Sequence, residues 1–73
     1  MSVIKLTSFS IELSTGTIET FRLNDTYRSI FLRERPDYIQ IEVTEEIEGE
    51  VKVIDVVYVR ANTTSWAYER LIT

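Results

Sequence analysis

The feature that most constrains the fold of this chain is a regular alternation of apolar and polar residues that a single glycine interrupts. In "SFSIELSTGTIETFRL", Phe9 and Ile11 alternate with serine and glutamate before Gly16, and the alternation resumes with Phe21. A period of two is typical of a β-strand with one buried face. We therefore predict a β-hairpin with a three-residue loop at 14–16. This loop places Phe9 opposite Phe21 and puts glycine where a left-handed backbone is needed.

A second hairpin is predicted in "YIQIEVTEEIEGEVKVIDVVYV". Residues 47–49 form another three-residue loop that ends in glycine, so that Val43 faces Val53 on the core side. On this register Asp55 also falls on the core side, where an unpaired charge is costly. We expect a β-bulge near Ile54 and Asp55 to turn the carboxylate outward.

Between the hairpins, four residues follow the i, i+3, i+4, i+7 spacing of an amphipathic helix: Tyr27, Ile30, Phe31 and Glu34. Asn24 or Asp25 can cap the N-terminus of this helix, and Pro36 ends it. The sequence therefore predicts one helix of about ten residues, which must dock on the sheet because a helix of that length is marginal alone.

The segment "NTTSWAYERLIT" is ambiguous. Its first residues offer helix caps, and Ala67, Glu69 and Leu71 are good helix formers. Trp66 and Tyr68 also belong to an alternation that is typical of a strand. We favour the helix. The expected fold class is thus α+β, a single domain over residues 1–73 with the element order ββαββα.

The composition limits the chemistry that is available. With 73 residues, 44% of them hydrophobic, the chain can build one small core and is too apolar to be disordered. It contains no cysteine and no histidine. This removes thiolate nucleophiles, Cys-based zinc sites, the commonest general base and the commonest transition-metal ligand. We expect no enzymatic activity, no cofactor and no metal site.

The charge and the hydropathy pattern indicate the class of partner. The formal net charge is −4, and an acidic chain gains nothing from counterion release on a phosphate backbone. No apolar run approaches the roughly 18 residues that span a bilayer. We therefore expect a cytoplasmic protein without a membrane partner, for which nucleic acid is a secondary candidate and a basic protein surface the first.

The second hairpin supplies the candidate site. Five carboxylates gather around its turn with no lysine or arginine among them: Glu42, Glu45, Glu46, Glu48 and Glu50. On the register above, its outward face also carries four apolar residues: Tyr38, Ile54, Val56 and Tyr58. An apolar centre rimmed by charge is typical of an interface. We predict that these residues bind a larger protein, by docking on a basic surface or by strand addition at a free edge such as Val3 to Leu6.

Two alternatives stay open. The first is nucleic-acid binding through a cluster of arginines with aromatic neighbours: Arg22, Arg28, Arg33 and Arg35. The second is a self-associating structural protein, a homodimer in which the surplus apolar face pairs across a two-fold axis.

In size, acidity and lack of catalytic groups, the chain resembles small phage-encoded regulators that seize a host enzyme, such as inhibitors of RNA polymerase. The resemblance covers size and charge. It implies a protein of the host cytoplasm that binds a basic or edge-strand surface on a larger host protein and affects transcription by blocking or redirecting that protein.

Overall fold

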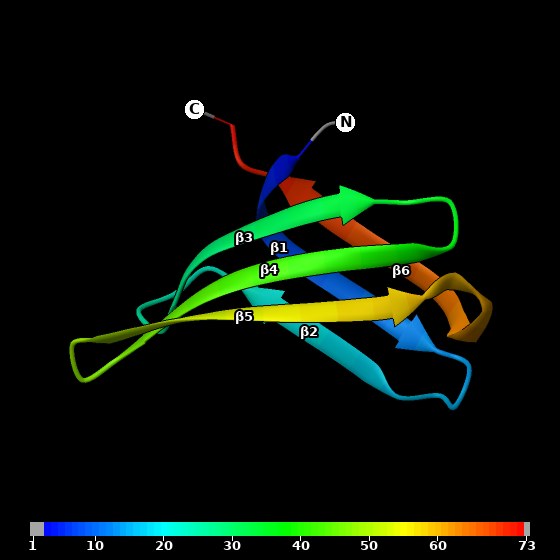
Figure 1. Cartoon of the computed structure of the whole chain (residues 1–73), viewed down its shortest axis with the longest axis horizontal. Helices are drawn as coiled ribbons and strands as arrows, with labels where there is room; N and C mark the ends of the chain where they lie inside the picture. The colour runs from blue at the N-terminus through cyan, green and yellow to red at the C-terminus, as the bar shows by residue number, and fades with distance from the viewer. Residues whose placement is uncertain (1–2, 73) are drawn as a thin grey trace.

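The computed structural model describes residues 3–72 and shows an antiparallel β structure (Figure 1). Its strands are β1 (Ile4–Leu13), β2 (Ile18–Arg22), β3 (Tyr27–Glu34), β4 (Tyr38–Ile47), β5 (Glu50–Val59) and β6 (Thr63–Arg70). A single 3-10 turn, η1 (Arg60–Asn62), is the only helical element among the described residues. The α+β prediction is therefore wrong, because both segments expected to be helices are strands.

The strands form one sheet that curls into a half-barrel around β1. The order is β2-β1-β3-β4-β5, and β6 pairs with β1 in addition. The first residues of β1 pair with β3 and the later ones with β2. β6 pairs with β1 from Leu6 to Leu13. A register shift between Leu6 and Ser8 marks a bulge, and bulges bend strands. Figure 1 shows the result as two crossing layers, with β3, β4 and β5 in front of β6, β1 and β2.

The core fills the space between these two layers. Nine hydrophobic side chains are buried there: Leu6, Phe9, Ile11, Ile30, Leu32, Ile39, Ile41, Val43 and Tyr58. Along β4 the buried residues recur at every second position, as the alternation of a strand requires. The bulge in β1 lets Leu6 and Phe9, which are three positions apart, both face inward.

The first hairpin has the predicted register. Phe9 lies opposite Phe21, and the amide of Leu13 donates to the carbonyl of Thr17 at 2.8 Å, so that residues 14–16 form the loop. Gly16 has a φ of 91°, in the left-handed region that glycine adopts without strain. The prediction for this hairpin is confirmed.

The predicted helix after the first hairpin is strand β3. Its Ile30 and Leu32 are buried at alternate positions, paired with β1 on one side and β4 on the other. The Oδ1 of Asn24 accepts hydrogen bonds from the amides of Thr26 and Tyr27 at 2.7 Å each, a helix-cap type of contact that here closes a turn into a strand. Partners on both edges satisfy the backbone of this segment, which outweighs the helical spacing of its side chains.

The C-terminal segment is strand β6 instead of a helix. Trp66 lies opposite Ile11 and Tyr68 opposite Phe9, so β6 covers the edge of β1 that would otherwise be unpaired. Trp66 packs against the core, with the guanidinium of Arg60 at 4.9 Å from the centre of its ring. The alternating pattern of this segment was the correct one.

Candidate interaction surface

The turn between β4 and β5 decides which side chains of this hairpin face solvent. It is a two-residue turn, with Ile47 opposite Glu50, and the predicted three-residue loop is wrong. Glu48 has a φ of 52° and Gly49 a φ of 80°, the positive values that a type I′ turn requires at both central positions. A one-residue change of register moves every side chain to the opposite face.

This register removes the misplaced charge without a bulge. Asp55 lies opposite Glu42 and is exposed, and the pairing of β4 with β5 shows no register shift. The predicted bulge near Ile54 and Asp55 is therefore wrong. Asp55 instead accepts a hydrogen bond from the side-chain amide of Gln40 at 3.3 Å on the outer face.

The predicted apolar binding face is divided between the two sides of the hairpin. Ile54 and Val56 lie opposite the buried Val43 and Ile41, so they face the core and not a partner. Tyr58 is buried as well, while Tyr38 keeps an outward position opposite Val59. These corrections follow from the same change of register.

Tyr58 connects the two layers of the half-barrel. Its hydroxyl donates to an Oε of Glu19 on β2 at 2.7 Å, and its ring lies 6.1 Å from the ring of Phe9. Burial raises the pKa of the Tyr58 hydroxyl, and the hydrogen bond and negative charge of Glu19 raise it further. The residue thus acts in the structure of the monomer.

The outward face of β5 carries four exposed valines, which we name the valine row: Val51, Val53, Val57 and Val59. Between 48% and 62% of each of these residues is exposed. Asp55 interrupts the row at its centre. β5 is also the last strand in the sheet order, so no strand among the described residues covers its other edge. Edge strands in native proteins are usually short or carry charges or proline; this one is long, and Asp55 is the single charge between the valines of its outward face.

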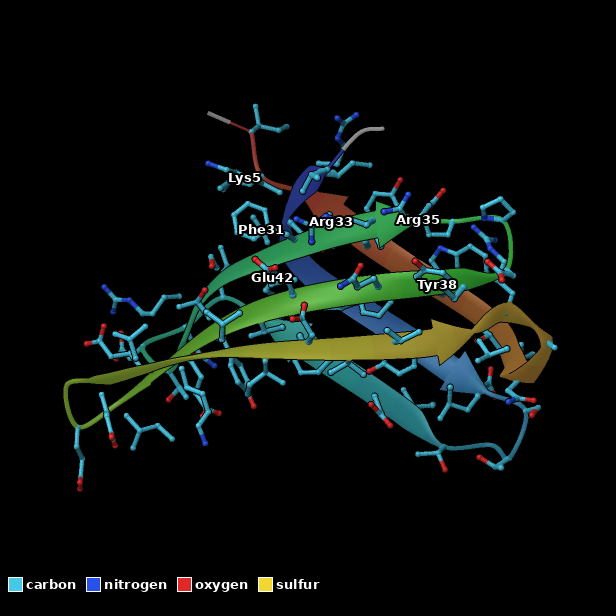
Figure 2. The ribbon with its side chains drawn as sticks, in the orientation of Figure 1. Lys5, Phe31, Arg33, Arg35, Tyr38 and Glu42 are labelled. Carbon is cyan, nitrogen blue, oxygen red and sulfur yellow. The ribbon has the colours of Figure 1, made fainter. Side chains whose placement is uncertain are left out.

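The outer face beside the valine row mixes aromatic and charged side chains, and Figure 2 shows them in front of β3 and β4. The guanidinium of Arg33 lies 3.5 Å from a carboxylate oxygen of Glu42. The ammonium of Lys5 lies 5.8 Å from the centre of the Phe31 ring. Arginine and aromatic residues are enriched at protein interfaces. The face therefore has the composition of an interface, with its most apolar part at β5.

The five glutamates do not form a single patch. Glu42 lies in the middle of the outer face, whereas Glu45 lies on the other face of the hairpin, opposite Lys52. Glu46, Glu48 and Glu50 lie at the end of the hairpin, which projects beyond the other strands in Figure 1. The alternation of the strands separates residues that are adjacent in sequence. Only part of the predicted acidic cluster thus borders the valine row.

The four arginines of the nucleic-acid alternative are also separated. Arg22 ends β2 and lines a shallow hollow with Ser8 on the outer side of the β1–β2–β6 layer. Arg28 lies at a register shift in β3, and Arg33 and Arg35 follow on the outer face. The Nε of Arg35 is buried without an acceptor among the described residues. The structure therefore brings only two of these arginines together.

The edge from Val3 to Leu6 is not free for strand addition. Leu6 pairs with Ile30 of β3 on one side and with Arg70 of β6 on the other. The amide of Leu71 also donates to the carbonyl of Lys5 at 2.9 Å. The predicted site of strand addition is therefore wrong, and β5 offers a free edge instead.

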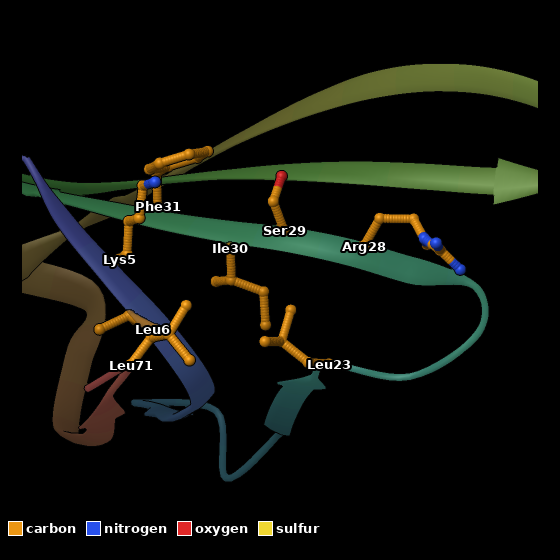
Figure 3. A pocket seen from close by; sticks show the side chains of 8 residues that line it. All are labelled: Lys5, Leu6, Leu23, Arg28, Ser29, Ile30, Phe31 and Leu71. Atoms are coloured by element: carbon orange, nitrogen blue, oxygen red, sulfur yellow. The ribbon is translucent and has the colours of Figure 1, made fainter. Parts of the chain in front are cut away.

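The hollows of the surface do not gather catalytic groups. Figure 3 shows one of about 170 Å³ between β1 and β3, where Leu6, Leu23, Ile30 and Leu71 line an apolar floor. Two others, of about 320 Å³ and about 400 Å³, lie beside Lys52 and beside Trp66. Within residues 3–72 no three His, Cys, Asp or Glu side chains are placed to hold a metal ion. The same residues contain no helix with the length and apolar character of a membrane span.

Comparison of the chain with protein-family models, with curated proteins and with solved structures finds no match.

The valine row is the functional candidate that the sequence analysis missed. Its residues were assigned to the core side because the wrong register exchanged the two faces of β5. The available signal was Asp55, whose position between Val53 and Val57 marks the outward side of the strand. A charge in the middle of an apolar strand indicates the solvent face more reliably than the valines indicate the core.

Proposed function

We propose that this protein is a non-enzymatic binding module that attaches to a larger protein through the outer face of β3, β4 and β5. The valine row forms the apolar part of this interface at the edge strand β5, and the charged side chains of β3 and β4 border it on one side. Protein interfaces combine apolar contact area with polar and charged residues in this way.

One observation carries this proposal. The valines of the row are about half exposed, whereas the outward positions of β1 carry serine and glutamate. Four valines on one exposed strand edge favour aggregation unless a partner covers them. We infer that they are kept apolar because a partner buries them.

The carboxylates nearest the valine row favour a basic contact on the partner, whereas Lys5, Arg33 and Arg35 lie on the same face beyond β4. Glu42 and Asp55 lie opposite each other in the centre of the face, and Glu46 lies beside Val51 at its end. The chain as a whole carries a net charge of −4. Complementary charge on the partner would accelerate association and fix its orientation. For a partner of the type implied by the phage regulators, a host RNA polymerase, the protein would act in the host cytoplasm and affect transcription.

The proposal is tested with Val53→Thr combined with Val57→Thr, which keeps the β-branched shape and removes apolar surface. Tagged wild-type and variant proteins are compared in affinity capture from candidate host cells and in binding to purified RNA polymerase. We expect the variant to retain about a tenth or less of the bound partner, since a few central residues dominate interface energies. Its melting temperature should stay within about 3 °C of the wild type, because exposed positions contribute little to stability.

Ile18→Thr is the matched control, because Ile18 is 65% exposed on β2, outside the outer face of β3–β4–β5. Capture by this variant should equal that of the wild type. Equal capture by the double valine variant, or an equal loss in the Ile18 control, would contradict the proposed interface.

A second candidate is single-stranded nucleic-acid binding, which one observation favours. Lys5, Phe31, Arg33, Arg35 and Tyr38 share the outer face (Figure 2), and such binders combine cations with aromatic rings on which bases stack. Glu42 opposes this candidate because it neutralises Arg33. A gel-shift titration with single- and double-stranded probes at about 50 mM salt tests it, since phosphate contacts are strongest at low salt. Absence of a shift there eliminates this candidate.

A further inference from the structure

The free edge of β5 exposes the backbone of the same residues that carry the valine row. Hydrogen-bonded and non-hydrogen-bonded pairs alternate along an antiparallel ladder. A two-residue turn makes Ile47–Glu50 a hydrogen-bonded pair, and the amide of Arg60 donates to the carbonyl of Asp37 at 3.0 Å at the far end. Both ends of the β4–β5 ladder therefore assign the same pairs as hydrogen-bonded. The N–H and C=O groups of residues 51, 53, 55, 57 and 59 therefore point away from β4.

A strand added to this edge would make two kinds of contact at once. Its backbone would pair with the outward N–H and C=O groups of the odd-numbered residues of β5. Its side chains opposite these residues would lie on the outer face, beside the valine row and Asp55. Strand addition uses main-chain hydrogen bonds for affinity and alternate side chains for specificity. The edge is thus suited to an extended segment with apolar residues at alternate positions.

Asp55 argues against a second copy of this chain as the added strand. Antiparallel pairing of two β5 strands about a two-fold axis at Asp55 would match Val53 with Val57 and Val51 with Val59. The same register opposes the two Asp55 carboxylates directly, and like charges opposite each other are destabilising. Shifting the pairing by two residues either way places Asp55 opposite a valine, where its carboxylate loses solvent without gaining a partner.

We infer that the partner segment is a β-strand that carries lysine or arginine opposite Asp55, flanked at alternate positions by β-branched apolar residues. Asp55 has one neutral hydrogen-bond donor, Gln40, and faces the carboxylate of Glu42 across the ladder. A cation on the added strand would therefore pair with Asp55, whereas Glu42 already has the guanidinium of Arg33 at 3.5 Å. This inference deepens the proposed function and rests on it, because it names the segment that the valine row and the free edge bind.

The probe is a peptide of about nine residues, Val-Thr-Val-Thr-Lys-Thr-Val-Thr-Val, with short Gly-Ser flanks. Its core has the same order of residue types in both directions, so parallel and antiparallel addition both bring the lysine opposite Asp55. A second peptide carries glutamate at the centre. Binding is measured by fluorescence anisotropy, and amide hydrogen exchange locates the contact on β5.

We expect the lysine peptide to bind about fivefold or more tightly than the glutamate peptide, because one cross-strand pair changes from attraction to repulsion. Amides of Val53, Asp55 and Val57 should gain protection from exchange. Asp55→Lys should reverse the preference, so that the glutamate peptide binds better. Such a reversal cannot arise from a general loss of fold.

Val57→Pro tests the backbone contact separately. The N–H of Val57 points to the free edge. Proline at this position therefore removes the hydrogen bond that β5 donates to the added strand and leaves the ladder with β4 intact. Proline is tolerated at such edge positions. Binding of both peptides should fall at least tenfold while the circular dichroism spectrum is unchanged. Val53→Pro supplies a second variant if Val57→Pro fails to fold, because the N–H of Val53 also points away from β4.

The outcomes separate this inference from the proposed function. Equal affinity for the two peptides, or no binding of either at millimolar concentration, overturns the inference. If the variant with Val53→Thr and Val57→Thr still loses its captured partner in that case, the proposed interface stands although the inference about the partner strand fails. A concentration-dependent dimer in sedimentation equilibrium that Val57→Pro abolishes overturns the inference in favour of a second copy. If the valine variant captures as much partner as wild type, the proposed function itself fails.

Discussion

Strands β1 and β5 have the same length but opposite surroundings and opposite side-chain chemistry. β1 lies in the middle of the sheet and presents Ser8, Ser10 and Glu12 on its outward side. β5 lies at an edge and presents the valine row. If burial in the monomer alone decided the outward residues, the polar ones would lie on β5, because this strand has fewer neighbours than β1. The difference shows that the fold of the monomer accounts for the residues of β1 and leaves the outward valines of β5 about half exposed at a sheet edge that no described strand covers.

The largest expected effect would come from removing apolar volume on the β1 side of this comparison. Ile11 is fully buried, and Ile11→Ala should lower the free energy of unfolding by about 3 kcal/mol, the cost of lost burial plus a cavity. A domain of this size has only a few kcal/mol of stability, so much of the variant should be unfolded at 25 °C. Urea denaturation followed by circular dichroism measures the change.

The matched substitution on β5 is Val57→Ala, at a residue that is 54% exposed. The free energy of unfolding should change by no more than about 0.5 kcal/mol, as at other surface positions. Comparable losses for Ile11→Ala and Val57→Ala would break the comparison, because the valine row would then contribute to the monomer core.

An intermediate effect is expected at Tyr58, the one residue of β5 whose hydroxyl reaches β2. Tyr58→Phe removes the hydrogen bond to Glu19 and should cost about 1.5–3 kcal/mol, the usual range for a bond to a charged group. Thermal unfolding at pH 7 measures the loss. A variant with wild-type stability would mean that the two layers are held together without this bond.

The same residue predicts a pH dependence with a definite sign. Burial and Glu19 raise the pKa of Tyr58 above the ordinary tyrosine value of about 10. Below that pH both folded and unfolded chains keep the proton, and the stabilisation is complete. Above it the unfolded chain loses the proton first, so the free energy of unfolding falls with pH, by at most about 1.4 kcal/mol per unit. Tyr58→Phe should fall less steeply than wild type between pH 9 and pH 11.5.

The smallest expected effect concerns the two turns. Glu48 has a positive φ, and Asn-Gly is the preferred sequence of a type I′ turn, so Glu48→Asn should stabilise the protein by about 0.5 kcal/mol. Thr15→Asn is the control in the first hairpin, because Thr15 has no positive φ and should show no gain. A gain at both turns, or at neither, in chemical denaturation would contradict the assignment of different turn types to the two hairpins.

The sequence was sufficient for the first hairpin because only one of its faces is apolar. With Ser8, Ser10 and Glu12 on one side of β1, a single register aligns Phe9 with Phe21. The second hairpin lacks this information, since both faces of β5 carry apolar residues and the alternation alone is compatible with two registers. The structure selects between them through Glu48, whose left-handed backbone is uncommon for glutamate and is not indicated by its identity.

The two helix predictions failed because local spacing competes with pairing between distant segments. Residues 27–34 satisfy both a helical and an alternating pattern, and their contacts with β1 and β4 favour the strand. Trp66 and Tyr68 take strand positions because β1 has an edge to cover. The predicted partner site inherited the register error: Ile54, Val56 and Tyr58 face inward, while Tyr38 and Glu42 remain on the outer face.

The pairing of β1 with β6 has a consequence for folding during synthesis on the ribosome. Thr7 donates its hydroxyl hydrogen bond to the carbonyl of Glu69, 62 positions later. During synthesis, one edge of β1 stays without its pairing strand β6 until residue 70 has left the exit tunnel of the ribosome. Contacts of such long range slow folding. We expect shortening the chain before Trp66 to leave a product that chaperones retain or proteases remove, because β1 then lacks the strand that pairs with its edge.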